Sequence, residues 1–162
     1  TRRRMSITVG VNIHFSLGSL SIDMTTNLAF EHTPDGRKIV VGRELSVGRD
    51  IAWNLLRNTQ QWTEWGPSVR AVECNQQFID IDTTGRVQTV GGLWLPFEIT
   101  SCMSYRWHWR VMKLPATGHR VDQPSTGSPR EGCRVIFELP ILAAWYIPVC
   151  SRALDRIESI LL

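Results

Sequence analysis

The sequence lacks the motifs of several common enzyme classes. It contains no G-x-S-x-G nucleophile elbow, no glycine-rich phosphate loop after a strand and no H-E-x-x-H zinc motif. Nucleophile-elbow hydrolases, nucleotide enzymes and zincins therefore have no support in the sequence. We expect neither a cofactor nor a metal ion.

The chain has no net positive charge outside its first residues. The 162-residue chain has a formal net charge of +3, and Arg2, Arg3 and Arg4 account for all of it, because the rest has as many basic as acidic residues. A nucleic-acid-binding surface usually requires a basic patch or stripe. We therefore expect no nucleic-acid partner.

The chain also lacks paired cysteines and long apolar runs. Cys74, Cys102, Cys133 and Cys150 form no C-x-x-C pair, which favours reduced thiols in a cytoplasmic protein over two disulfides in a secreted one. No apolar run approaches the roughly 20 residues that a membrane-spanning helix needs. We expect a cytoplasmic protein without an integral membrane segment.

Residues 1–36 are predicted to be an N-terminal extension of a single domain that covers residues 37–162. Alternating apolar residues from Ile7 to Phe15 are compatible with an added strand, and the alternative is a disordered tail. Polar residues interrupt this stretch, so we do not expect a signal peptide. Thr33 to Gly36 has the composition of a turn. We expect the extension to be dispensable for folding.

The segment from Arg43 to Val72 organises the rest of the chain. A strand up to Val47 precedes a helix, which Asp50 is placed to cap. A second short helix carries Trp62 and Trp65, which are predicted to pack the helix layer against the sheet. Gly66 and Pro67 end this helix.

A run of strands and one helix complete the chain. An amphipathic helix is predicted from Ile141 onward, in which Pro148 either lies in the first turn or produces a kink. The pattern predicts an α+β fold, in which a curved antiparallel sheet of about seven strands wraps a long C-terminal helix and two short helices follow the first strand. The expected strands are Lys38 to Val47, Val69 to Asn75, Gly85 to Val90, Leu95 to Cys102, Arg106 to Lys113, Thr117 to Gln123 and Cys133 to Leu139.

Strand alternation assigns the two faces of this sheet. The face toward the helix is expected to be apolar. His119 belongs to this face, among Thr117 and Val121, and is the candidate for proton transfer or for a hydrogen bond to a ligand. The opposite face is expected to be solvated and carries Glu98, Thr100, Arg106, His108, Arg110, Arg134 and Glu138.

The stretch WTEWGPSVRAVE, residues 62–73, resembles a signature of the SRPBCC superfamily, which includes START-like and polyketide cyclase-like proteins. The similarity continues through LPFEIT, YRWHWRV, PATGHRV and GCRVIFELP and covers about Lys38 to Leu162. The resemblance implies a helix-grip fold and a pocket for a hydrophobic ligand between the sheet and the C-terminal helix. The residues alone, without this resemblance, favour a solid core.

We therefore expect a protein that binds a small hydrophobic or aromatic molecule in this cavity. One alternative is an enzyme of the polyketide cyclase/dehydratase type, with His119 as acid or base beside Tyr105, Tyr146 or an arginine. Another is a protein-interaction module similar to helix-grip co-chaperones. The oligomeric state stays open. The expected ligand-binding residues are Trp65, Leu95, Phe97, Ile99, Trp107, Trp109, Val111, His119, Val121, Val135, Phe137, Trp145 and Val149.

Overall fold

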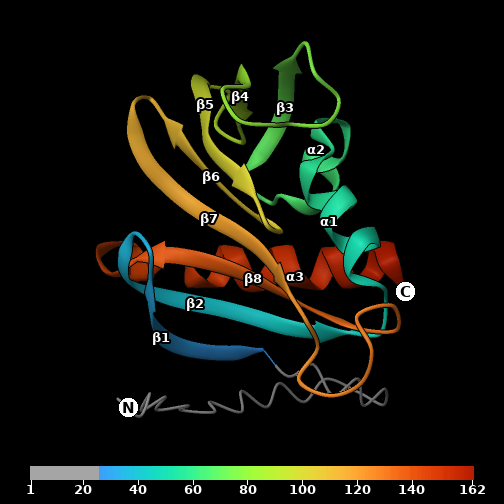
Figure 1. The fold of residues 1–162 in the computed structure, drawn as a ribbon. Coiled ribbons are helices and arrows are strands. Elements are labelled where there is room, and N and C mark those ends of the chain that lie inside the picture. Colours follow the sequence, from blue (N-terminus) through green and yellow to red (C-terminus); the bar gives the residue numbers. More distant parts are fainter. Residues whose placement is uncertain (1–25) are drawn as a thin grey trace, which may run out of the picture.

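The structure, a computed structural model, describes residues 26–162 and contains one antiparallel sheet (Figure 1). The sheet has eight strands in the order β1-β2-β8-β7-β6-β5-β4-β3. All seven strands predicted from the sequence are present, and β1 is additional. The strands are β1 (Asn27–Thr33), β2 (Gly36–Leu45), β3 (Val69–Cys74), β4 (Thr84–Thr89), β5 (Trp94–Met103), β6 (Arg106–Val111), β7 (Leu114–Asp122) and β8 (Cys133–Pro140).

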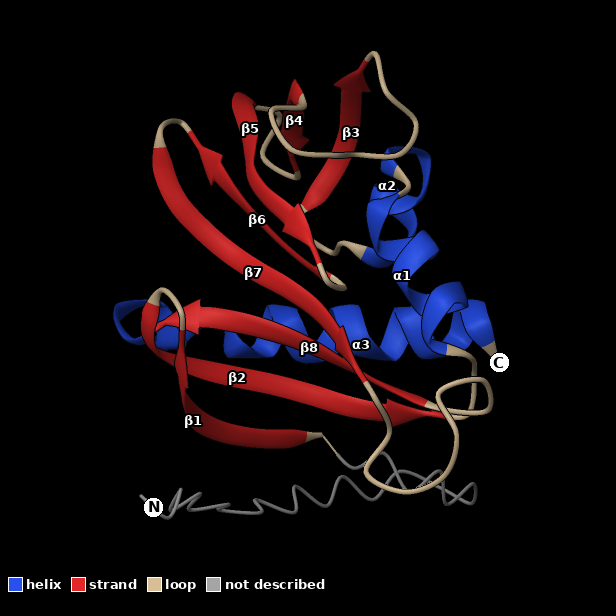
Figure 2. Ribbon diagram, in the orientation of Figure 1, coloured by secondary structure: helices blue, strands red, loops and turns tan. Residues whose placement is uncertain are grey.

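The helices form a second layer (Figure 2). Between β2 and β3 the chain forms α1 (Arg49–Arg57), the 3₁₀ helix η1 (Thr59–Gln61) and α2 (Trp62–Trp65). After β8 come the 3₁₀ helix η2 (Ile141–Tyr146) and α3 (Ile147–Leu161). The helix α3 runs behind β8 and β2 in Figures 1 and 2. The predicted α+β architecture, a sheet wrapped around a long C-terminal helix, is confirmed.

The apolar face of α3 makes this packing stable. Cys150, Ala153, Leu154 and Ile157 are buried and follow the three- and four-residue steps that place side chains on one side of a helix. Of the two expected positions for Pro148, the structure has the first turn, where its missing N–H removes no helical hydrogen bond. The same face meets the apolar side of β2 and β8 in one continuous core.

The strand β1 lies inside the predicted extension. It pairs with β2 from Asn27 opposite Gly42 to Thr33 opposite Gly36, and the turn predicted at this point joins the two strands. This pairing argues against dispensability for residues 27–33. The strand expected between Ile7 and Phe15 lies outside the described residues. Thermal unfolding of a chain that begins at Asp35 would test whether residues 1–34 are dispensable.

A buried arginine ties β2 to the C-terminal half of α3. The Arg43 side chain is 3% exposed, and its Nη1 lies 2.7 Å from Asp155 Oδ1 and 2.9 Å from Glu158 Oε2. Both carboxylates belong to α3 and remain partly exposed. The interaction fixes the register of the helix along β2.

The outer face of the sheet differs from the prediction. It was expected to be solvated, but Glu138 is 1% exposed. Arg106 Nε donates to Glu138 Oε1 and Arg106 Nη2 donates to Oε2, both at 2.9 Å, and Arg120 Nη1 donates to Oε1 at 3.1 Å. His108 Nε2 lies 3.4 Å from Oε2. The expected exposure of Glu98, Thr100 and Arg110 is confirmed.

The charge of Glu138 is stabilised by these neighbours. Burial alone would raise its pKa, but hydrogen bonds from Arg106 and His108 and the charges of Arg106 and Arg120 hold the pKa well below its ordinary value. A depressed pKa favours the folded state above the unfolded-state pKa of about 4.5, and this contribution is lost as the pH falls below that value.

We expect Glu138→Gln to lower the free energy of unfolding at pH 7 by about 3 kcal/mol, because it leaves two partly buried arginines without their shared, fully buried carboxylate. The matched control is Glu73→Gln. Glu73 bridges Arg86 at the exposed surface, so its replacement should cost less than about 1 kcal/mol. Urea unfolding of both variants checks this, and equal losses would contradict a special role for Glu138.

Candidate functional site

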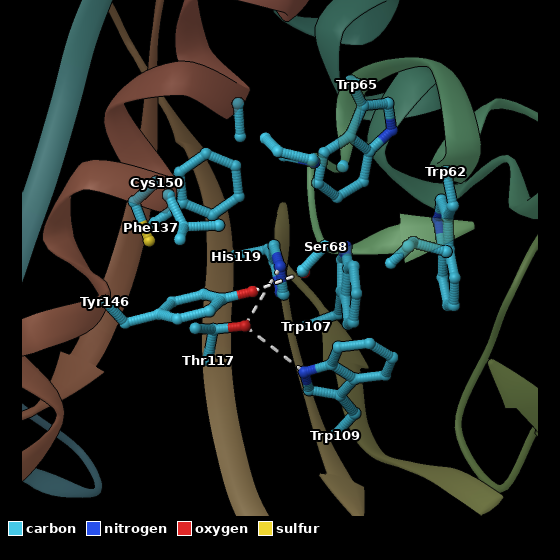
Figure 3. A pocket seen from close by; sticks show the side chains of 15 residues that line it. Trp62, Trp65, Ser68, Trp107, Trp109, Thr117, His119, Phe137, Tyr146 and Cys150 are labelled. Atoms are coloured by element: carbon cyan, nitrogen blue, oxygen red, sulfur yellow. Dashed lines mark hydrogen bonds between the residues drawn. The ribbon is translucent and has the colours of Figure 1, made fainter. Parts of the chain in front are cut away.

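A pocket opens between the sheet and the start of α3 (Figure 3). The concavity holds about 440 Å³ of empty space when its open mouth is counted, but only about 40 Å³ is wide enough to admit the centre of a water molecule. The second value measures the interior space, because the first includes open solvent. The lining residues are Trp62, Trp65, Gly66, Pro67, Ser68, Val69, Trp107, Trp109, Thr117, His119, Phe137, Tyr146, Val149, Cys150 and Ala153.

A column of stacked rings forms one wall. Trp62 from α2 stacks on Trp107 from β6, with ring centroids 5.4 Å apart and planes 6° apart. Trp107 stacks in turn on His119 from β7, at 3.8 Å and 12°. The three side chains are at most 3% exposed. Strand alternation places Trp107 and His119 opposite each other in the β6–β7 register, which lets their rings meet.

Three polar contacts cross or border the pocket (Figure 3). The hydroxyls of Ser68 and Tyr146 are 2.6 Å apart and join the α2–β3 turn to the beginning of α3. Trp109 Nε1 donates to Thr117 Oγ1 at 3.3 Å, and the same oxygen lies 3.4 Å from His119 Nε2. Thr117 therefore connects the indole of Trp109 to the imidazole of His119.

Other buried nitrogens of the wall lack a partner. Trp65 Nε1, Trp107 Nε1 and His119 Nδ1 have no hydrogen bond within residues 26–162. By contrast, Trp62 Nε1 donates to the carbonyl of Leu56 at 2.9 Å. Buried polar atoms are almost always satisfied by protein or by water, so the wall has unused capacity for hydrogen bonds.

His119 is neutral in this environment. Burial lowers its pKa to about 3, and the nearby His108 contributes to this lowering, while Glu138 opposes it. The wall contains no Asp, Glu, Lys or Arg side chain from the described part of the chain. The site is therefore an uncharged apolar pocket with a few hydrogen-bonding groups.

The structure brings together part of the predicted set. Several predicted residues do not line the pocket. Phe97, Ile99, Val121 and Val135 are buried in the core beside it, and Leu95 and Val111 pack against that core. The predicted residues that line the pocket are Trp65, Trp107, Trp109, His119, Phe137 and Val149.

The prediction that Trp145 lines the pocket is wrong. The prediction placed it on the inner face, but it is 76% exposed. The helical spacing assumed a continuous α-helix from Trp145 to Val149. Residues Ile141–Tyr146 instead form a 3₁₀ helix with a non-helical residue at Ala143, and three residues per turn rotate the side chains differently. As a result Tyr146 lines the pocket instead of Trp145.

Some wall residues were not predicted as ligand-binding. Tyr146 and Ala153 lie three residues before and four residues after Val149, and Cys150 lies four residues after Tyr146, so helical spacing contained a signal for them. Thr117 shares the strand face of His119 and could have been included on the same ground. Ser68 could not, because the geometry of the turn after Pro67 decides where its hydroxyl lies.

The prediction for Asp50 also needs correction. Helix α1 has no side-chain cap, and the Asp50 carboxylate instead accepts a hydrogen bond from the Tyr105 hydroxyl. Arg49 lies over the Tyr105 ring at 3.8 Å. Tyr105 is held there and does not line the pocket, so it does not pair with His119.

The described residues show no cluster of His, Cys, Asp and Glu that could hold a metal ion. The four cysteines are free. In the part of the chain that the structure describes, no helix is both long and apolar enough to cross a membrane. The expected cytoplasmic location stays a prediction.

Comparisons with known proteins show the fold alone. No protein-family model and no curated protein matches the sequence. Solved structures do match. The protein XoxI from Bacillus cereus is 10% identical, with a TM-score of 0.59, and the match covers 75% of this chain and 93% of that one. A norcoclaurine synthase point mutant from Thalictrum flavum, in complex with a transition-state analogue, is 10% identical, with a TM-score of 0.51 and coverage of 83% and 95%.

The low pKa of His119 predicts a pH dependence of stability. The unfolded chain binds a proton at His119 below about pH 6.5, whereas the folded protein does not until about pH 3. The free energy of unfolding should therefore rise with pH by up to about 1.4 kcal/mol per unit between about pH 4 and 6. His119→Gln should remove this slope, and the exposed His32→Gln should not. Urea unfolding at several pH values measures both, and an unchanged slope in His119→Gln would contradict a neutral buried imidazole.

The bond between Ser68 and Tyr146 gives a second prediction. Ser68→Ala and Tyr146→Phe should each lower the free energy of unfolding by about 1 kcal/mol, because each removes one hydrogen bond. The double variant should lose at most a few tenths of a kcal/mol more than either single variant, since both changes remove the same hydrogen bond. A double-mutant cycle by urea unfolding measures this coupling, and fully additive losses would show that the hydroxyls do not interact.

Proposed function

We propose that this protein binds a small apolar or aromatic molecule in the pocket between β6–β8 and α3. One observation carries the proposal: the pocket wall is apolar and uncharged but contains buried polar atoms without a partner. Ligand sites typically combine mostly apolar walls with a few convergent polar groups. Membership of the SRPBCC superfamily is part of the proposal, and residues 62–73 together with the helix-grip architecture support it.

The present size of the pocket sets a condition on binding. A space of about 40 Å³ holds water, whereas an apolar cavity that binds benzene is about 150 Å³. A ligand must therefore widen the gap. The bond between Ser68 and Tyr146 spans this gap, and breaking it removes the hydrogen bond that joins the α2–β3 turn to the start of α3.

Acid/base catalysis has weaker support. The enzyme hypothesis requires a second positioned group near His119, and Tyr105 is held elsewhere by Asp50. Tyr146 is the tyrosine that remains at the pocket, and burial raises its pKa. An imidazole with a pKa of about 3 is a weak base at neutral pH, because efficient proton transfer requires a pKa near the working pH.

The interaction-module hypothesis has one supporting observation. Leu142 is 95% exposed and Trp145 is 76% exposed, both on η2. Large apolar side chains exposed side by side are typical of contact surfaces. This surface lies outside the pocket, so a role in protein contacts is compatible with the proposed ligand binding.

Binding can be tested with an apolar probe. Ethylbenzene should quench or shift tryptophan emission, because Trp107 and Trp109 line the wall. Ala153→Trp should abolish the effect, since a bulky side chain on α3 would fill the space, at a cost of about 1 to 3 kcal/mol in stability.

The matched control is Ala144→Trp, which adds the same side chain at an exposed position of η2 and should leave probe binding unchanged. Because each variant adds a fluorophore, displacement of a second probe followed by NMR should confirm the result. If millimolar ethylbenzene perturbs neither tryptophan emission nor NMR spectra of the wild-type protein, the interior is solid and the proposed function fails.

A further inference from the structure

Two neighbouring rings of the pocket wall each have an unused nitrogen. Trp107 and His119 stack with centroids 3.8 Å apart, and both side chains are at least nine-tenths buried. Trp107 Nε1 and His119 Nδ1 have no partner in the described part of the chain. Stacking at this distance holds the two nitrogens close enough for one ligand oxygen about 3 Å from each.

Thr117 determines which nitrogen of His119 carries the proton. Trp109 Nε1–H can only donate, so it occupies one lone pair of Thr117 Oγ1. The hydroxyl hydrogen of Thr117 then has His119 Nε2, 3.4 Å away, as its acceptor. With the proton on Nε2 instead, Thr117 Oγ1 would face two N–H donors, and neither of these two groups could accept the hydroxyl hydrogen of Thr117. The arrangement that uses both the lone pair and the hydroxyl hydrogen of Thr117 therefore places the proton of the neutral imidazole on Nδ1.

We propose that Trp107 Nε1–H and His119 Nδ1–H together bind the oxygen of a neutral, carbonyl-bearing aromatic molecule. The inference rests on the proposed function and specifies its ligand class. Both groups are donors, so they match an acceptor oxygen rather than a hydroxyl hydrogen. The stacked rings and Phe137, which lies 5.1 Å from the His119 ring centroid, supply aromatic surface beside that oxygen.

The charge of the pocket excludes two other classes of ligand. No carboxylate from residues 26–162 lines the wall to pair with a cation, and no arginine or lysine is there to pair with an anion. Burying an unpaired charge costs several kcal/mol or more. The two N–H groups can stabilise a neutral oxygen at a much smaller desolvation cost. In the ligand-free protein the site is large enough for a water molecule. On binding, the carbonyl oxygen takes the place of this water.

Three probes of similar shape separate these classes. Ethylbenzene has no polar group, acetophenone adds one neutral acceptor and benzoate adds a charge. We expect acetophenone to bind roughly tenfold more tightly than ethylbenzene through the two hydrogen bonds, and benzoate to bind more weakly than either. The seven indole N–H signals in ¹H–¹⁵N spectra locate the contact. The Trp107 signal should move downfield with acetophenone but not with ethylbenzene.

The protein contains its own controls for this shift. The N–H groups of Trp62 and Trp109 already donate to Leu56 and Thr117, so their signals should respond equally to both probes. Trp107→Phe and His119→Phe should each reduce the preference for acetophenone to about threefold or less. Trp94→Phe, which changes an indole outside the pocket, should keep the full preference. If the Trp107 or His119 variant does not fold, the wild-type spectra and the ratio of affinities decide the question.

Equal affinity for ethylbenzene and acetophenone, with no selective shift of the Trp107 signal, would overturn the carbonyl site and leave the proposed function intact. Tighter binding of benzoate would overturn it in favour of an anion site. If none of the three probes binds, the proposed function itself fails, and the carbonyl site fails with it.

Discussion

The stack of Trp62, Trp107 and His119 is the interaction on which the pocket depends. It joins α2 to β6 and β7 through flat contacts, and each aromatic pair contributes about 0.5 to 1.5 kcal/mol beyond the area it buries. Trp62 is also tied to its own helix layer through Leu56. The stack therefore fixes the distance between helix layer and sheet on one side of the pocket.

The opposite side is held more loosely. There the α2–β3 turn meets α3 through apolar contacts and the hydroxyl pair of Ser68 and Tyr146. A wall that is rigid on one side and joined by apolar contacts and one hydrogen bond on the other can widen without disturbing the sheet. This asymmetry reconciles a small interior with the proposed binding of a larger molecule.

The sequence predicted most of the sheet because side-chain alternation is a local property. It missed β1, although the turn before Gly36 was recognised, because Asn27–Thr33 mixes polar and apolar residues and becomes a strand only by pairing with β2. Trp107, His119 and Phe137 were placed on the correct face for the same local reason. Trp145 was not, because a change from α to 3₁₀ geometry leaves no clear mark in the spacing.

The outer face shows a different limit. Alternation correctly assigned Glu138 to that face, but it does not reveal what covers a side chain. Arg106 and Arg120 reach Glu138 from β6 and β7, and this contact depends on the register between strands. Register is set by the whole sheet, so burial of a charged residue on an outer face cannot be inferred from one strand.

The salt bridges of Arg43 have a mechanical consequence for α3. They anchor the helix at Asp155 and Glu158, whereas Tyr146 lies nine residues before Asp155, a span of about 14 Å at the rise of an α-helix. A helix fixed near one end acts as a lever. A tilt of about 10° around Asp155 moves the other end by roughly 2 Å. Because Arg43 holds the helix near Asp155, a small rotation of α3 produces its largest displacement at the mouth of the pocket.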